Sequence, residues 1–185
     1  MDLRVEKTRK NIINAFLEIR SGKPLEKITV KEIAERAEIN KATFYLHYHD
    51  IYDLSETIEK EVVQSTLLSI QHPELVFTDT RRFTNELCES FVANEPLIKI
   101  LFEGNRSSCF IDLFESGLKQ LIKKVNPDYE ESMERNVAIT YLIYGGYYTY
   151  FKFANCGVKK VFDLIGKFSE EIVKLDKSGN ENEAE

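Results

Sequence analysis

The stretch from Thr29 to Tyr48 constrains the fold most, because it reads as two short helices joined by a tight turn. Thr29 and Glu32 form a Thr-x-x-Glu capping box, which marks the start of the first helix. One face of that helix is apolar, at Val30, Ile33, Ala34 and Ala37. Asn40 is a good N-cap for the second helix. This pattern predicts a helix-turn-helix, whose second helix can lie in a DNA major groove.

The second helix separates an inner face from an outer one. Phe44 and Tyr48, four residues apart, point to one side and predict the buried face. The residues expected to contact DNA are Thr29, Lys41, Ala42, Thr43, Tyr45 and His47. Lys41 and Thr43 are placed for base edges, and Ala42 for close approach or a thymine methyl group. The others are placed for phosphates. An ordinary exposed surface is the alternative interpretation.

The segment IAERAEINKATFYLHYHDIYDL closely resembles the helix-turn-helix of the tetracycline-repressor (TetR) family of bacterial regulators. The helix expected over 4–21 also resembles the family, and the resemblance covers about residues 4–70. It implies an all-α fold of about nine helices. A three-helix DNA-binding domain would be joined by a long helix to a helical regulatory and dimerisation domain.

Two positions depart from the family pattern. Family members usually carry Gly in the turn, where the backbone is left-handed, and this chain has Glu38. A residue with a Cβ atom is expected to cost about 1 kcal/mol there. The family also often has a phosphate-contacting Lys just after the recognition helix, and this chain has Ile51.

The pattern predicts four parts. Residues 1–50 form the helix-turn-helix domain, 51–72 a connecting helix, 73–176 an effector-binding and dimerisation domain, and 177–185 a disordered tail. In the third part, the patterns predict helices over 79–94, 96–102, 107–125, 129–155 and 158–175.

Charge does not by itself point to DNA, because the formal net charge is −6. Residues 1–60 carry equal numbers of basic and acidic side chains, so the remainder carries the whole excess. DNA binding therefore requires a local basic surface. The candidates are Arg4, Lys7, Arg9, Lys10, Lys23, Lys27 and Lys41.

Several other classes of function find no support. The three cysteines are widely spaced and show no metal-binding spacing, so they are expected to be reduced thiols in the cytoplasm. His47 and His49, two apart on a helix, cannot chelate one metal ion together. No set of nucleophile, base and orienting group suggests an enzyme. No cofactor, signal peptide or membrane span is expected.

The helix expected over 129–155 is the most aromatic part of the chain. One interpretation is core and dimer packing. The other is an aromatic cavity for an apolar or aromatic small molecule, lined by Phe110, Phe114, Tyr144, Tyr148 and Phe151. The resemblance favours the cavity, because many family members bind a small effector in this domain.

The last two helices carry more apolar surface than one small domain needs. The residues expected at a homodimer interface are Leu142, Phe153, Val161, Leu164, Ile165, Phe168 and Ile172. In the family the equivalent helices pair across a two-fold axis. The DNA site is therefore expected to be an imperfect palindrome.

The resemblance implies a sequence-specific transcriptional regulator. Most relatives repress transcription and release DNA when an effector binds. Two alternatives remain open: an activator of the same fold, and a protein–protein adaptor that has lost DNA binding, which Glu38 and Ile51 would support.

Overall fold

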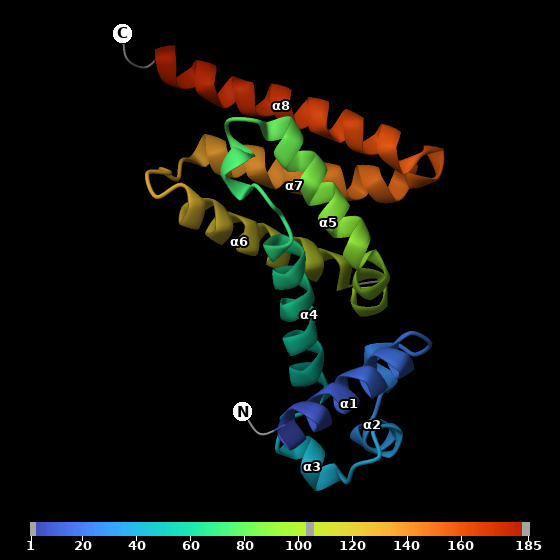
Figure 1. The fold of residues 1–185 in the computed structure, drawn as a ribbon. Coiled ribbons are helices and arrows are strands. Elements are labelled where there is room, and N and C mark those ends of the chain that lie inside the picture. Colours follow the sequence, from blue (N-terminus) through green and yellow to red (C-terminus); the bar gives the residue numbers. More distant parts are fainter. Residues whose placement is uncertain (1–2, 103–105, 183–185) are drawn as a thin grey trace. The chain divides into compact units, whose positions relative to one another are not determined.

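The computed structural model describes residues 3–102 and 106–182, with side chains described up to residue 174 (Figure 1). Within these residues the chain forms eight α-helices and no strand, which confirms the all-α prediction. The helices are α1 (Leu3–Arg20), α2 (Val30–Arg36), α3 (Lys41–Tyr45), α4 (Ile51–Leu68), α5 (Thr80–Leu101), α6 (Ser107–Val125), α7 (Met133–Phe153) and α8 (Val158–Asn182). None of the described helices is long and apolar enough to cross a membrane.

The chain divides into two compact units. The first contains Met1–Val62 and Pro96–Ser107, and the second contains Val63–Glu95 and Ser108–Glu185. The boundaries fall inside α4 and inside α5, so the end of α5 belongs with the N-terminal helices.

The first unit packs around the apolar faces of α1 to α4. The inner faces predicted for the helix-turn-helix are confirmed, since Ile33, Phe44 and Tyr48 are buried, and the side chains of Phe16 and Leu54 are buried with them. From the end of α5, three further apolar side chains are buried, those of Ile98, Leu101 and Phe102. Helices α2 and α3, of seven and five residues, would be marginal in isolation. They are therefore stabilised mainly by the burial of their apolar side chains in this core.

A charged side chain also lies inside the first unit. Glu59 of α4 is 0% exposed, and its carboxylate accepts hydrogen bonds from Arg106 Nε at 3.0 Å and Nη2 at 2.5 Å. Ser55 Oγ donates to the same carboxylate at 2.7 Å. A buried carboxylate is tolerated only when it is paired and hydrogen-bonded, and here three donors meet that requirement.

The second unit is built from α5 to α8 (Figure 1). Helices α7 and α8 lie side by side, and a short 3₁₀ helix, Ala154–Cys156, joins them. The turn ends at Gly157, whose φ of 111° suits only a residue without a side chain. This hairpin forms one side of the unit, and α5 and α6 pack against it.

Several predicted boundaries differ from the structure: α4 ends at Leu68 and not at residue 72, and α7 begins at Met133, after its N-cap Ser132, and not at residue 129. The segments expected as separate helices over 79–94 and 96–102 form the single helix α5, with Pro96 inside it. Proline removes one backbone hydrogen bond, but the buried residues beyond it keep the chain helical. Helix α8 continues to Asn182, into the predicted tail. The rest of that tail, 183–185, lies outside the described residues.

The turn between α2 and α3 is a Schellman motif with Glu38 in the left-handed position. The N–H of Ile39 donates to the carbonyl of Ala34 at 2.9 Å, and the N–H of Glu38 donates to that of Glu35 at 3.3 Å. The φ of Glu38 is 56°. The predicted left-handed backbone is confirmed, although glycine is absent.

Glu38→Gly is therefore expected to raise the free energy of unfolding by about 1 kcal/mol, because it relieves the Cβ strain at positive φ. Chemical denaturation measures the change. Glu38→Ala is the matched control, because alanine removes the carboxylate and keeps the Cβ atom. Equal stabilisation by both substitutions would assign the effect to charge instead of backbone strain.

Candidate nucleic-acid interface and ligand cavity

The first candidate site begins at the N-terminus of α2, where the predicted capping box is confirmed. Thr29 N donates to Glu32 Oε2 at 2.9 Å, and Glu32 N donates to Thr29 Oγ1 at 3.3 Å. Thr29 Oγ1 also donates to Glu32 Oε2 at 2.8 Å. Hydrogen bonds from Lys23 and Thr29 lower the pKa of Glu32, so a carboxylate sits where Thr29 was expected to hold a phosphate.

Helix α3 is short, and its cap fixes its outer face. Asn40 Oδ1 accepts from Thr43 N at 2.7 Å and from Thr43 Oγ1 at 3.0 Å. Phe44 anchors the helix in the core, whereas Lys41, Ala42 and Tyr45 are exposed. Four of the six predicted DNA-contacting residues thus lie on one five-residue helix.

The other two predicted contacts flank this helix. His47 is half-buried and lies just past the end of α3, and Thr29 is exposed at the start of α2. The sequence assigned no role to Leu46, whose side chain is 85% exposed between Tyr45 and His47. An apolar side chain that is this exposed beside α3 is a candidate contact for an apolar group of a partner, such as a thymine methyl group. In the sequence, the only indication of this exposure is that Leu46 lies between Tyr45 and His47, two residues expected on the outer face.

Ion pairs reduce the basic character of the first unit. Of the basic residues proposed from the sequence, Arg9 pairs with Glu61, and Lys23 with Glu32 at 2.5 Å. Among the described residues, no carboxylate lies within ion-pair distance of Lys41. Lys41 is also exposed at the first position of α3, where its cation is accessible to a nucleic acid.

The second candidate site is an apolar cavity of about 130 Å³ in the second unit. It lies between α5, α6, α7 and α8, with Val76 and Phe77 of the preceding connection adding to its wall. A cavity of this size lined by apolar side chains is known to stay dry and to hold a benzene-sized molecule.

The residues that line this cavity coincide only in part with those predicted from the sequence. Phe110 and Phe114 line the cavity, whereas Tyr144, Tyr148 and Phe151 do not. The tyrosines that do are Tyr147 and Tyr150. Successive helical residues are about 100° apart, so the inner face of α7 differs from the predicted one by about one residue. Tyr148 is 55% exposed, and Tyr144 donates a hydrogen bond to Asp112 at 2.7 Å.

Several polar groups of the lining are hydrogen-bonded within the protein or are held in their uncharged form. Thr80 Oγ1 donates to the Val76 carbonyl and Ser169 Oγ to the Ile165 carbonyl, both at 2.9 Å. Burial raises the pKa of the Cys88 thiol to about 12. Burial, with a hydrogen bond to Glu95, raises that of Tyr150 to about 12. Near pH 7 these groups carry no charge.

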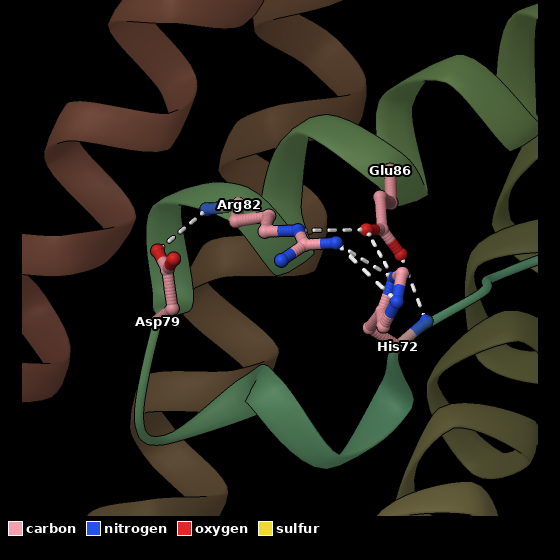
Figure 2. A network of polar contacts seen from close by, with 4 residues as sticks. All are labelled: His72, Asp79, Arg82 and Glu86. Atoms are coloured by element: carbon pink, nitrogen blue, oxygen red, sulfur yellow. Dashed lines mark hydrogen bonds and ion pairs between the residues drawn. The ribbon is translucent and has the colours of Figure 1, made fainter.

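A polar cluster holds the connection that forms the cavity wall (Figure 2). His72 N donates to Glu86 Oε2 at 2.9 Å, and His72 Nδ1 lies 2.8 Å from Glu86 Oε1. Arg82 Nε donates to the same carboxylate at 3.3 Å, and Asp79 Oδ1 accepts from Arg82 N at 3.1 Å. The cluster therefore fastens both ends of the segment that carries Val76 and Phe77.

The outer surface of α7 and α8 is unusually apolar. Met133, Val137, Tyr141 and Tyr148 fall along one exposed stripe of α7. On α8, Leu164 and Phe168 are also exposed, as is Phe153 at the end of α7. Of the residues expected at a dimer interface, Leu142, Val161 and Ile165 instead face the interior. Exposed apolar surface of this extent is typical of protein–protein contacts.

Comparisons with known proteins agree with the helix-turn-helix. Residues 12–58 match the family model described as bacterial regulatory proteins, tetR family. A solved structure, that of the TetR-like transcriptional regulator LfrR from Mycobacterium smegmatis, is 19% identical to this chain, with a TM-score of 0.40. The match covers 87% of this chain and 93% of that one. No curated protein matches the sequence.

The cluster at Glu86 predicts a pH-dependent stability. Burial opposes the ionised form, but hydrogen bonds from His72 and Arg82 outweigh it and hold the pKa of Glu86 below its ordinary value of 4.5. A lowered folded-state pKa stabilises the protein above the ordinary value, and this stabilisation is lost as the pH falls through the lower one.

The wild type should therefore be more stable than Glu86→Gln at neutral pH, and the difference should shrink as the pH falls below 4.5. Chemical denaturation at a series of pH values measures it. Glu89→Gln, at an exposed position of the same helix, controls for the loss of one charge. A difference that persists unchanged in acid would contradict the assigned role of the carboxylate.

Proposed function

Because its helix-turn-helix segment is that of the TetR family of bacterial regulatory proteins, we propose that this protein is a dimeric, sequence-specific transcriptional repressor. A small molecule in the cavity of the second unit releases it from DNA. The observation that carries the proposal is the exposed face of α3, which presents Lys41, Ala42 and Tyr45 from a helix anchored by Phe44.

The contacts follow from chemistry and position. Lys41 carries a mobile cation at the first position of α3 and is assigned to base edges and nearby phosphate. Thr43 donates its hydroxyl hydrogen to Asn40, so toward DNA its oxygen acts as an acceptor. Tyr45, His47 and Thr29 are assigned to phosphates, with Thr29 limited by the Glu32 carboxylate beside it.

The turn geometry also bears on the adaptor alternative. Glu38 is one of the two sequence positions that favour the adaptor, a protein of this fold that has lost DNA binding. Its left-handed backbone and Schellman hydrogen bonds show that the turn forms without glycine. This leaves Ile51, a half-buried residue at the start of α4, as the remaining departure.

Lys41→Ala is expected to weaken binding to the preferred DNA by about 1–3 kcal/mol and to relax sequence preference. Gel shifts with fragments selected from a random pool, over a range of salt concentrations, measure both effects. Lys60→Ala removes an exposed lysine from α4 and serves as the control. If Lys41→Ala leaves affinity and preference unchanged, α3 is not the reading helix. Absence of salt-dependent binding to any DNA would favour the adaptor.

The exposed stripe on α7 and the exposed residues of α8 support the dimer. Two copies that bury these surfaces against each other would present two α3 helices related by a two-fold axis, which is what an imperfect palindrome requires. Tyr141, at 67% exposure, and Phe168, at 62%, are the most exposed aromatic side chains on this surface.

Sedimentation equilibrium should give twice the chain mass of 21.5 kDa for the wild type. Phe168→Glu should shift the equilibrium toward monomer, because it places a charge in the apolar contact. Lys160→Glu, an exposed charge change on the same helix, should leave the dimer intact. A monomeric wild type at micromolar concentration would remove the basis for palindromic recognition.

A further inference from the structure

The volume of the cavity in the second unit limits the size of what it can hold. About 130 Å³ is available between α5, α6, α7 and α8. An apolar cavity of about 150 Å³ stays dry and takes up one benzene molecule. The cavity therefore has room for one six-membered ring. A second fused ring would have to displace side chains of the wall, which protein interiors resist because they are closely packed.

Aromatic rings from all four helices line the cavity. Phe91 of α5 lies 5.7 Å from Phe110 of α6, 6.1 Å from Tyr147 and 5.3 Å from Tyr150, measured between ring centroids, and all three contacts are edge-to-face. Tyr150 in turn stacks on Phe162 of α8 at 5.5 Å. A further aromatic ring can make contacts of the same two kinds, which contribute more than the buried area alone. The wall therefore favours an aromatic ring over an aliphatic ring of similar size.

The polar groups of the wall favour a ligand without charge. Burial raises the pKa of Tyr147 and raises that of the Cys88 thiol to about 12. Arg135 also lines the cavity, and its guanidinium lies 5.4 Å from the ring centroid of Tyr129 and donates through Nη1 to the Glu130 carbonyl at 2.6 Å. The guanidinium is thus engaged by the protein itself. An ionised ligand would lose its hydration in this apolar space, which costs far more than the transfer of a neutral molecule.

A glycine contributes to the space in the cavity. Gly146 of α7 lines it, and a Cβ atom at this position would lie 3.7 Å from Ile165 Cγ2, which is an ordinary van der Waals distance. Alanine therefore fits there and places its methyl group in the wall. The preceding residue, Gly145, is exposed and lies outside the lining, and a Cβ atom there would meet nothing within 4 Å. The two positions form a matched pair for substitution.

We propose that the cavity binds an uncharged aromatic compound with a single ring, of about the size of benzene or toluene, and that Gly146 keeps part of the space for this ring open. This inference rests on the proposed function, because it names the class of effector for the same cavity. Its binding experiments use no DNA, so they can fail independently of that function.

The first experiment varies the size and kind of ring and leaves the protein unchanged. In calorimetric titrations, toluene should bind about fourfold more tightly than benzene, as expected for the burial of one more carbon. Naphthalene should bind more weakly than toluene by about tenfold or more, although it is more apolar, because it overfills the cavity. Methylcyclohexane should bind about two- to tenfold more weakly than toluene, because it lacks the ring contacts.

The second experiment varies the charge. Nitrobenzene and benzoate have nearly the same shape, and at pH 7 only benzoate carries a net charge. Nitrobenzene should bind more tightly than benzoate by about a hundredfold or more, because the apolar wall does not replace the hydration of the carboxylate. Equal affinity of the two compounds, or tighter binding of benzoate, would contradict the preference for an uncharged ligand.

The third experiment varies the wall. Gly146→Ala should weaken toluene binding about five- to a hundredfold, because the added methyl group and the ligand overfill the same space. Benzene, which is smaller, should lose less affinity than toluene. Gly145→Ala makes the same change in helix propensity and adds its methyl group outside the cavity, so it should leave both affinities unchanged. A melting curve of each variant checks that it is folded.

Three outcomes would overturn the proposal. Tighter binding of naphthalene than of toluene would remove the size limit, and equal loss of toluene binding in both glycine variants would remove the role of Gly146. Absence of binding by benzene, toluene and nitrobenzene would show that the cavity does not take a single aromatic ring. Gel shifts are read separately. Toluene binding without DNA binding would overturn the proposed function alone, and DNA binding without toluene binding would overturn this inference alone.

Discussion

The ion pair between Glu59 and Arg106 is the interaction on which the first unit most depends. It connects the middle of α4 to the chain just before α6, 47 residues later in sequence, and explains why Pro96–Ser107 belongs to the same compact unit as the N-terminal helices. A carboxylate with no exposed surface costs several kcal/mol to desolvate, so its position is fixed by the donors it finds. The helix-turn-helix is therefore built on a core that includes one buried charge pair among its apolar contacts.

The sequence predicted the helix-turn-helix well because the signals for it are local. A capping box, an Asn cap and two aromatic residues four apart are read within single turns of helix, and the structure contains each of them. The left-handed turn at Glu38 followed from the family pattern. The Glu59–Arg106 pair was not predicted, because nothing local links two charges so far apart in the chain. The same applies to the pairs that engage Arg9 and Lys23.

A cavity was one of two interpretations of the aromatic helix α7, and the residues that line it differ in part from the expected ones because of how α7 is oriented. Apolar and aromatic residues surround this helix, so periodicity alone does not decide which side faces inward. The orientation depends on what packs against it, namely Phe91 and Phe110 on one side and Phe162 on another. Tyr147 and Tyr150 therefore line the cavity, and Tyr148 points outward. The presence of Arg135 in the cavity wall likewise emerges only from the tertiary structure.

The position of Cys88, half-buried in the cavity wall, has a further consequence for the protein's response to oxidants. Peroxides react with the thiolate form of cysteine, and sensor cysteines combine a low pKa with ready access to solvent. Cys88 has the opposite character, because burial raises its pKa to about 12 and its neighbours in the wall are apolar. Its sulfur thus behaves as a small hydrophobic group. Peroxides should therefore react slowly with Cys88, and the cavity wall should keep its apolar character at this position.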